Sequence, residues 1–318
     1  MAVTGATGFI GGHVTKDFVT RGWDVRAIVR PGTKYHPEPG VTLVQAPLDA
    51  RALTDAFTGC DAVVHLAGVV RTLDAQVYSA VNVEGTRAVA EAARAVDARL
   101  VHISSLAAAG AATPASPQTE DDEPKPLTPY GRSKLDSERL VAAIPGLRWI
   151  ILRPGVVYGP GDRAVLPVFK SAERGILPLV GREGAAYTFV HVSDMVRAVV
   201  AAIDTAADRE ILFVGHPQPV TARELLEAVR RAIGRPATII RIPLAAANVA
   251  ASVCDLAARV IGHPLPLNRW RYVELSAAGF VCNVDRLRDR LGIIAAIGLT
   301  EGFAETAEWY RREGWIRR

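Results

Sequence analysis

Sulfur-containing and aromatic residues are scarce in this chain. It has three cysteines, Cys60, Cys254 and Cys282, two methionines, and only 6% aromatic residues. The cysteines are far apart in the sequence and form no CxxC pair, so the chain offers neither a disulfide framework nor the ligand spacing of a zinc site. We therefore expect a protein of a reducing compartment, the cytoplasm, with no metal site.

The chain also lacks a large excess of charge. Its 37 basic and 33 acidic residues leave a net charge of +4. The basic residues are spread out, and only Arg311, Arg312, Arg317 and Arg318 bunch together. Such a distribution indicates a solvated terminus and gives no sign of a nucleic-acid-binding surface.

Uninterrupted hydrophobic runs are short. Glycines break up the beginning of the chain before the apolar core of a signal peptide could form. The longest apolar stretch, residues 242–261, contains Asn248, Asp255 and Arg259. We predict an amphipathic or buried helix there and no membrane span, with a surface-associated helix as the alternative.

Short apolar runs alternate with helical patterns through the first half. This alternation is typical of βαβ units, and runs rich in Val, Ile and Leu suit strands covered on both faces. The fold class that follows is α/β with a doubly wound parallel sheet. The expected strands are 1–4, 25–30, 41–46, 62–66, 100–104 and 148–152, and the expected helices are 11–21, 50–58, 83–96 and 129–143.

The second half has a different organisation. Residues 113–129, with five prolines and four acidic residues, predict a surface loop, and a Pro- and Gly-rich stretch follows Arg153. We expect a strand at 211–214 and helices at 193–206, 222–233 and 301–312. The predicted layout is a nucleotide-binding domain over 1–157, to which 190–215 returns, and a smaller, mostly helical substrate lobe from 158–189 and 216–318.

A glycine-rich turn joins the first strand to the first helix. Its glycines have the spacing GxxGxxG over Gly5, Gly8 and Gly11. Such glycines let the backbone approach a pyrophosphate, which the N–H groups at the helix start then bind. The flanking strand and helix make this a Rossmann-type dinucleotide site. The expected contacts are Gly5, Thr7, Gly8, Phe9, Ile10 and Gly11.

The end of the second predicted strand decides the choice of cofactor. NAD-selective sites carry an acidic residue there to bind the ribose hydroxyls. This chain has Arg30 instead, with Lys34 shortly after it. A guanidinium binds a 2′-phosphate in bidentate fashion, so we predict NADP, with NAD as the alternative.

Tyr130 and Lys134 are spaced so that they share one face of a predicted helix. A tyrosine can donate a proton to a carbonyl that receives hydride, or remove one from an alcohol. Ionising it at neutral pH costs about 4 kcal/mol, and a nearby ammonium should lower that cost. Lys134 can also hold a nicotinamide ribose.

Ser105 follows the strand at 100–104, at the edge of the sheet where ligands bind. Its hydroxyl can stabilise the substrate oxygen, and for Ser104 we expect strand-end capping instead. His65 and His102 are expected to be core residues rather than ligands. Near His191, Ser193 or Asp194 is the expected helix cap.

Taken together, these segments resemble the extended short-chain dehydrogenase/reductase family, also called the NAD-dependent epimerase/dehydratase family. The resemblance spans nearly the whole chain. The segments that carry it are TGATGFIG at 4–11, HLAG at 65–68, VNVEGT at 81–86, HISS at 102–105, YGRSK at 130–134, LRPGVVYGPGD at 152–162 and FVHVSDM at 189–195.

The resemblance implies roles for the matched positions. Ser105, Tyr130 and Lys134 would be catalytic. Members are commonly dimers, joined through the helices near 84–97 and 130–143. The further cofactor contacts it implies are Leu48 and Asp49 near the adenine, Ala67 and Gly68 along the cleft, Asn82 behind the active-site helix, and Pro154 and Val157 at the nicotinamide.

The resemblance also narrows the chemistry. Dehydratases of the family have an Asp-Glu pair after the catalytic hydroxyl residue, where this chain has Leu106 and Ala107. Sugar-nucleotide epimerases have Asn at the position of Val156. The pattern is more similar to the 3β-hydroxysteroid dehydrogenase and dihydroflavonol reductase branches, which act on bulky, mostly apolar alcohols and ketones. Candidate substrate contacts are Leu106, Val156 and Tyr158.

Three functions remain open from the sequence. The first is an NAD(P)-dependent oxidoreductase that interconverts an alcohol and a ketone with Tyr130 as acid or base. The second is a nucleotide-sugar epimerase with tightly bound NAD. The third is a non-enzymatic NADP-binding regulatory protein, which the retained Tyr130 and Lys134 disfavour.

Overall fold

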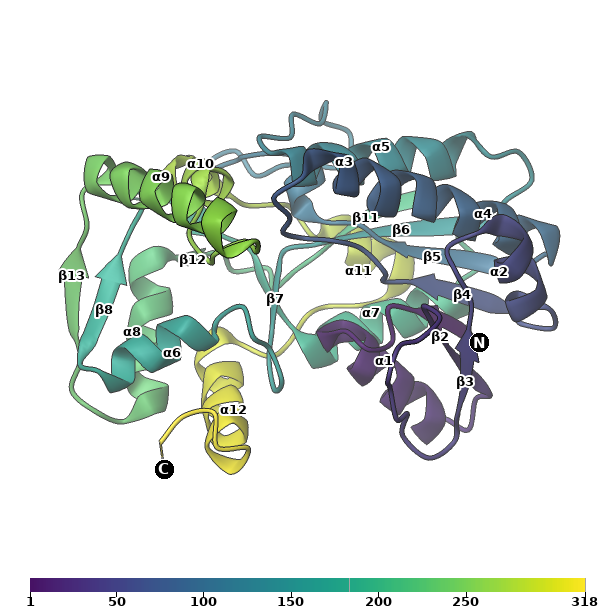
Figure 1. The fold of residues 1–318 in the computed structure, drawn as a ribbon, viewed down its shortest axis with the longest axis horizontal. Coiled ribbons are helices and arrows are strands. Elements are labelled where there is room, and N and C mark those ends of the chain that lie inside the picture. Colours follow the sequence, from purple (N-terminus) through teal and green to yellow (C-terminus); the bar gives the residue numbers. More distant parts are fainter. Residues whose placement is uncertain (183, 318) are drawn as a thin grey trace.

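A seven-stranded, all-parallel sheet forms the larger part of the molecule, and a smaller lobe stands beyond one of its edges (Figure 1). The computed structural model describes residues 1–182 and 184–317. The strand order is β11-β6-β5-β4-β1-β2-β3. The strands are β1 (Ala2–Thr4), β2 (Val25–Val29), β3 (Val41–Gln45), β4 (Ala62–His65), β5 (Arg99–Ile103), β6 (Trp149–Pro154) and β11 (Glu210–Val214).

Helices cover both faces of this sheet, which confirms the doubly wound α/β class. On one face α1 (Phe9–Thr20), α7 (Val192–Asp204) and α11 (Asp285–Leu291) pack on Val3, Val101 and neighbouring side chains. On the other face α2 (Ala50–Phe57), α4 (Gly85–Ala95) and α5 (Pro129–Ala143) pack on Ala2, Leu100 and their neighbours. Successive strand residues alternate between two apolar layers, which is why the strands are apolar on both sides.

Short irregular helices connect these elements at the edge where the strands end. α3 (Ala75–Val77) continues into a π-helical segment, Tyr78–Glu84, and a 3₁₀ turn, Leu106–Ala108, follows β5. π-helical turns often lie at functional sites. The first segment contains Asn82 and the second begins directly after Ser105, both of which the sequence analysis singled out.

The smaller lobe has its own apolar core, built on Tyr158, Phe169, Phe303 and Tyr310. It holds short strands as well as the expected helices. Its helices are α6 (Leu166–Glu173), α8 (Ala222–Ile233), α9 (Leu244–Ile261), α10 (Arg269–Ser276) and α12 (Leu299–Arg312). Its strands are β7 (Val156–Tyr158) with β10 (Phe189–His191), β9 (Ala186–Tyr187) with β12 (Val220–Thr221) and β14 (Gly279–Phe280), and β8 (Ile176–Leu179) with β13 (Thr238–Arg241).

The long apolar stretch forms α9, which is not a buried helix. Only Ala247, Ala251 and Ala258 of its 18 residues are buried. By length and composition α9 is the one helix in the described ranges that could cross a membrane. In the fold it lies on the outside of the lobe, packed on α10 (Figure 1).

Candidate functional site

The residues expected to bind a dinucleotide follow neighbouring strands in the order of the sheet. Because the strands are parallel, all their carboxyl ends meet at one edge. From β3 to β6 this edge carries, in order, Leu48 and Asp49, Arg30, the Gly5–Gly11 turn, Ala67 and Gly68, Ser105, and Pro154. The fold thus lines up these positions along a single track, which suits an extended ligand.

The turn after β1 has room only for glycine at two positions. Gly5 has a φ of +75°, and a Cβ there would lie 2.6 Å from the backbone nitrogen of Ala67. A Cβ on Gly11 would lie 2.2 Å from the carbonyl oxygen of Gly5. Among the described residues no side chain caps the start of α1 at Gly8. The backbone N–H groups at the start of the helix can therefore bind an anion that approaches the backbone closely. This turn fits the pyrophosphate of a dinucleotide.

Ser105, Tyr130 and Lys134 come together at the ends of β5 and α5. α5 begins after Thr128, whose hydroxyl accepts a hydrogen bond from the Gly131 N–H at 3.1 Å. The Ser105 side chain is hydrogen-bonded to the Tyr130 phenol. Lys134 is buried and donates from Nζ to the carbonyl oxygen of Ile103 over 2.8 Å. The fold therefore places a phenol, a hydroxyl and an amine around the end of one strand.

Burial controls the acidity of the two titratable groups at this site. It raises the pKa of Tyr130 to about 12, and the Ser105 hydrogen bond acts in the opposite direction. Burial also lowers the pKa of Lys134 to about 8, against the effect of Glu138. The expected lowering of the tyrosine pKa by an ammonium is not found, because desolvation dominates and the Lys134 Nζ is engaged with Ile103. The phenol is protonated at neutral pH.

Behind α5 lies a buried network that the sequence analysis did not identify. Glu138 accepts from the Arg153 guanidinium, with Nη2 to Oε2 at 2.6 Å and Nε to Oε1 at 3.0 Å. Ser104 also donates to Glu138, and so it is not the strand-end cap that we expected; Ser105 caps the following turn by accepting from Ala107. The spacing of Lys134 and Glu138 on one helix face was the available signal.

Asn82 fastens the π-helical segment to both neighbouring parts of the site. Its amide donates to Ser133 on α5 over 2.9 Å and to the Val69 carbonyl over 2.9 Å, and its oxygen accepts from the Val69 N–H. The ring of Tyr78, from the same segment, lies 6.3 Å from that of Tyr130. Asn82 thus holds both the loop after β4 and the start of α5.

The predicted adenine-side residues differ in what they do. Arg30 and Lys34 are exposed, and neither makes an ion pair in the described part of the chain. Asp49 uses its carboxylate to cap α2, accepting from Arg51 and Ala52 over 3.1 Å. The Asp49 carboxylate therefore serves as a helix cap, whereas the side chains of Arg30 and Lys34 are available to bind an anion.

Two of the three candidate substrate contacts lie in packed interiors. Tyr158 is 1% exposed in the core of the lobe, and its hydroxyl donates to the Gly298 carbonyl over 3.2 Å, which corrects that expectation. Leu106 is buried in a small cluster with Phe213 and Cys282. Val156 is 36% exposed at the start of β7, beside Pro154 and the half-buried Val157. Of the three, Val156 has a side chain available to a ligand.

His65 and His102 are buried core residues of the sheet domain. Thr86 donates to the Asn82 carbonyl, so His65 must donate to Thr86 from Nε2 and accept from Thr4 at Nδ1, over 2.9 and 2.6 Å. Burial, with a smaller effect of Lys134, lowers the pKa of His65 to about 3. Both His65 and His102 are fully buried, as expected.

His191 departs from the expectation for its segment. It caps α7 itself, accepting from the Ser193 N–H at 3.4 Å, so neither Ser193 nor Asp194 is the cap. Asp194 instead accepts from the N–H groups of Ala296 and Ile297, and so ties the chain before α12 to α7.

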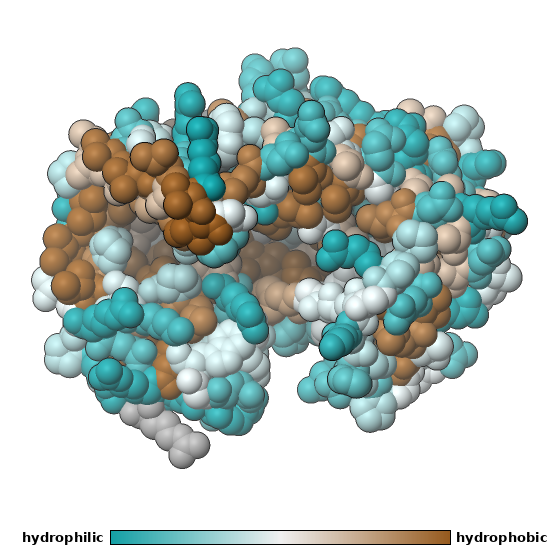
Figure 2. Space-filling view, viewed as in Figure 1, coloured by the Kyte–Doolittle hydropathy of each residue, from teal (hydrophilic) through white to brown (hydrophobic). Residues whose placement is uncertain are grey.

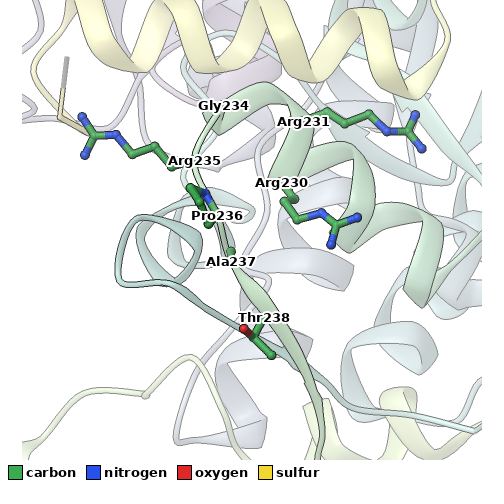
Figure 3. Close-up of a pocket in the computed structure, with 7 residues that line it drawn as sticks. All are labelled: Arg230, Arg231, Gly234, Arg235, Pro236, Ala237 and Thr238. Atoms are coloured by element: carbon green, nitrogen blue, oxygen red, sulfur yellow. The ribbon is translucent and has the colours of Figure 1, made fainter.

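A basic hollow at the end of α8 lies apart from this site. Arg230, Arg231 and Arg235 border it, but in Figure 3 their guanidinium groups point away from one another. Such an arrangement does not converge on an anion. In the described residues no group of three or more His, Cys, Asp or Glu side chains could hold a metal ion.

Another hollow lies between the sheet domain and the lobe and is visible in the centre of Figure 2. α10 of the lobe reaches the site, because the carboxylate of Glu274 acts electrostatically on both Tyr130 and Tyr78. The predicted cofactor residues and the Tyr130 phenol therefore lie on the side of the sheet domain that α10 of the lobe approaches.

Comparison with known proteins agrees with this geometry. The profile of the NAD-dependent epimerase/dehydratase family matches residues 1–215. The chain belongs to this family. It is an NAD(P)-dependent oxidoreductase of the extended short-chain type, with the Rossmann-type sheet that the sequence predicts.

Individual relatives extend over nearly the whole chain. The "Ceramide reductase" of Caulobacter vibrioides is 30% identical, over 99% of this chain and 96% of the relative. The "Sterol demethylase protein B" of Methylococcus capsulatus is 29% identical, over 99% of both chains. Among solved structures, "MoeE5 in complex with UDP-glucuronic acid and NAD" is 27% identical, with a TM-score of 0.78 over 98% of this chain and 99% of the other.

Proposed function

We propose that this protein is an NADPH-dependent reductase of a bulky, mostly apolar ketone. The observation that carries the proposal is that the fold brings the protonated Tyr130 phenol, the Ser105 hydroxyl and the Lys134 amine together at the carboxyl edge of the sheet. A protonated phenol is the form that donates a proton to a carbonyl oxygen. The same residues serve alcohol oxidation in the reverse direction.

The residues present fit a nicotinamide dinucleotide. The glycine turn, where a Cβ at Gly5 or Gly11 would collide with backbone, would hold the pyrophosphate at the start of α1. Lys134 would hold the nicotinamide ribose, and Arg30 with Lys34 would bind a 2′-phosphate, which favours NADP over NAD. When bound, the cofactor supplies the hydride. Further contacts are proposed for Thr7, Phe9, Ile10, Leu48, Asp49, Ala67, Gly68, Pro154 and Val157.

Side chains of the protein supply the proton to the substrate oxygen and stabilise the negative charge that develops on it. Tyr130 donates its phenolic proton to the substrate oxygen as charge develops there. Ser105 turns its hydroxyl proton from the Tyr130 oxygen to the substrate oxygen when the substrate binds, while its own oxygen still accepts from the Ala107 N–H. Lys134, charged below about pH 8, is assigned to the nicotinamide ribose rather than to the phenolate, because its charge does not lower the pKa of Tyr130 in this structure.

The exposed Val156 side chain and the relatives named above support an apolar substrate. A reductase of ceramide and a protein of sterol demethylation are similar to this chain over almost its full length. Val156 presents an apolar side chain at the cleft. The sugar-nucleotide epimerases of the family have Asn at this position.

A nucleotide-sugar epimerase is the second candidate, because MoeE5, a structural neighbour, binds UDP-glucuronic acid and NAD. Steady-state absorbance of the nicotinamide separates the two. We expect net consumption of NADPH in a panel of ketones and none with UDP-sugars. Epimerised UDP-sugar without net cofactor turnover, and no reduced ketone, would refute the reductase assignment.

We further propose a cytoplasmic homodimer joined through α4 and α5. The outward residues of these helices, including Arg94, Arg132 and Asp136, are mostly charged. A dimer through this face should weaken with salt, and sedimentation at low and high ionic strength tests it. A monomer under both conditions would overturn it.

A further inference from the structure

The helix α9 turns its large apolar side chains outward and its small ones inward. Val249, Val253, Leu256 and Val260 are between 62% and 84% exposed. Their spacing of four, three and four residues puts them on one face of the helix. The buried residues are alanines, at positions 247, 251 and 258 on the opposite face. A helix that merely completes a core has the reverse arrangement.

A polar stripe runs along one flank of the same helix. It consists of Asn248, Ser252, Asp255 and Arg259, again at helical spacing. The single acid, Asp255, is engaged, because its carboxylate accepts from the Arg269 N–H over 3.1 Å. The surface is therefore amphipathic, with an apolar ridge and a polar edge. In Figure 2 the ridge is visible as an exposed hydrophobic area on the lobe, beside the central hollow.

Positive charge accumulates around the ridge. Residues 241–274 contain four arginines, one aspartate and one glutamate, a net charge of +2, and Glu274 pairs with Arg271 over 3.2 Å. Trp270 is 42% exposed at the rim, with the Arg269 guanidinium 5.8 Å from its ring centroid. Exposed tryptophan and arginine beside an apolar ridge are typical of segments at the interface between lipid and water.

Both ends of α9 are anchored in the lobe. β13 precedes it and pairs with β8, from Thr238 opposite Ile176 to Arg241 opposite Leu179. α10 follows it and packs along it. A helix held at both ends on one side of a folded lobe can lie in the surface of a bilayer, but it cannot span one without unfolding that lobe.

We propose that the face formed by Val249, Val253, Leu256, Val260, Ile261 and Trp270 docks on a membrane with anionic headgroups. The apolar side chains enter the boundary between headgroups and acyl chains, and Arg259 and Arg269 bind lipid phosphates. A second copy of the chain fits this face less well, because two surfaces of net positive charge would have to meet. The inference concerns binding alone and does not depend on catalysis.

The position of α9 gives the docking a consequence that rests on the function proposed above. α9 packs on α10, and α10 carries Glu274, whose charge acts on Tyr130. The docked face is therefore one helix away from the catalytic cleft. A lipid-soluble ketone would enter the cleft from the bilayer without crossing water.

Flotation of the full chain with vesicles tests the docking. Vesicles of equimolar phosphatidylglycerol and phosphatidylcholine should carry the protein up the gradient, and pure phosphatidylcholine vesicles should carry much less. Added salt should weaken the binding, because screening reduces the attraction between the arginines and the anionic lipids.

Variants separate the docking from a general surface effect. V253D/L256D should lower vesicle partitioning at least about tenfold, since two buried apolar contacts are lost and two charges added. The control is I294D, which places one such aspartate at a 53% exposed apolar position outside α9, and it should bind like the parent protein. Circular dichroism of each variant shows that the fold is kept.

Several outcomes would overturn the proposal. One is a parent protein that stays at the bottom of the gradient when anionic vesicles are present. Another is a V253D/L256D variant that floats as well as I294D. A third is a dimer that V253D/L256D dissociates in sedimentation, which would make the face a contact between copies.

Activity measurements test the delivery of substrate separately. V253D/L256D should reduce a vesicle-embedded ketone more slowly than the parent while reducing a water-soluble ketone at the parental rate. Equal rates on both substrates would reject delivery but leave docking in place. Absence of any ketone reduction by the parent would reject the proposed function, and flotation would still decide the docking.

Discussion

The carboxylate of Glu138 and the guanidinium of Arg153 form an almost fully buried ion pair, with side chains 2% and 3% exposed. Removing one partner of such a pair leaves an uncompensated charge in the interior. R153M should therefore lower the free energy of unfolding by about 3–5 kcal/mol. The double variant R153M/E138L should recover most of that loss, because neither member of the ion pair is then left buried without its partner. Urea unfolding measures both; a double variant no more stable than R153M would contradict the interpretation.

Tyr130 is expected to carry the proton transfer. Y130F removes the phenolic proton but keeps the ring, so kcat for ketone reduction should fall about 10²–10⁴-fold with little change in NADPH binding. The matched control is Y78F, which removes the hydroxyl of the neighbouring ring and should lower kcat far less. The parental rate should decline as the pH rises through about 8, where Lys134 loses its charge. A Y130F enzyme with parental kcat on every active ketone would remove Tyr130 from the mechanism.

Two adjacent glycines make a matched test of the phosphate-binding turn. G11A places a methyl group 2.2 Å from the Gly5 carbonyl oxygen and should abolish cofactor binding and destabilise the fold. In G12A the new methyl meets nothing within 4 Å among the described residues. Because alanine favours the helical backbone, G12A should stabilise α1 by about 0.5–1 kcal/mol and keep cofactor binding. Fluorescence titration with NADPH and thermal unfolding measure the two effects, and similar behaviour of both variants would argue against the turn as a phosphate site.

Arg30 should determine the preference for NADPH. A charged hydrogen bond contributes about 1.5–3 kcal/mol, so R30Q should raise the KM for NADPH about ten- to hundredfold and leave that for NADH nearly unchanged. R223Q, an exposed arginine on α8 of the lobe, is the control and should change neither constant. An unchanged ratio of the two KM values in R30Q would show that NADP selectivity has another source.

The buried histidine pair should make the fold sensitive to acid. The pKa of His65 is lowered to about 3 in the folded protein, whereas an unfolded histidine titrates near 6.5. Between these values the unfolded chain binds the extra proton, so stability falls as the pH drops below about 6.5, by about 1.4 kcal/mol per unit for this group. H65Q should reduce the slope of the unfolding free energy against pH, and H36Q, at an exposed histidine, should leave it unchanged. Urea unfolding at several pH values gives the slopes, and identical slopes for H65Q and the parent would remove His65 as the cause.

The sequence by itself determined the sheet, the phosphate turn and the identity of the residues at the ends of the strands. These follow from local properties: apolar runs, glycine spacing, and the helical spacing of Tyr130 and Lys134. The sequence could not indicate that Ser104 binds Glu138 while Ser105 caps the turn, because both are serines at a strand end and only the packing of α5 distinguishes them.

Only the tertiary structure decided the environment of these groups. Burial raises the pKa of Tyr130 against the expected effect of Lys134, and it places Tyr158 in the core of the lobe rather than at the substrate. The same holds for α9, where the sequence shows an apolar helix but not which face the lobe leaves uncovered. Desolvation and exposure depend on contacts between residues that are distant in the chain, so a local sequence pattern cannot predict them.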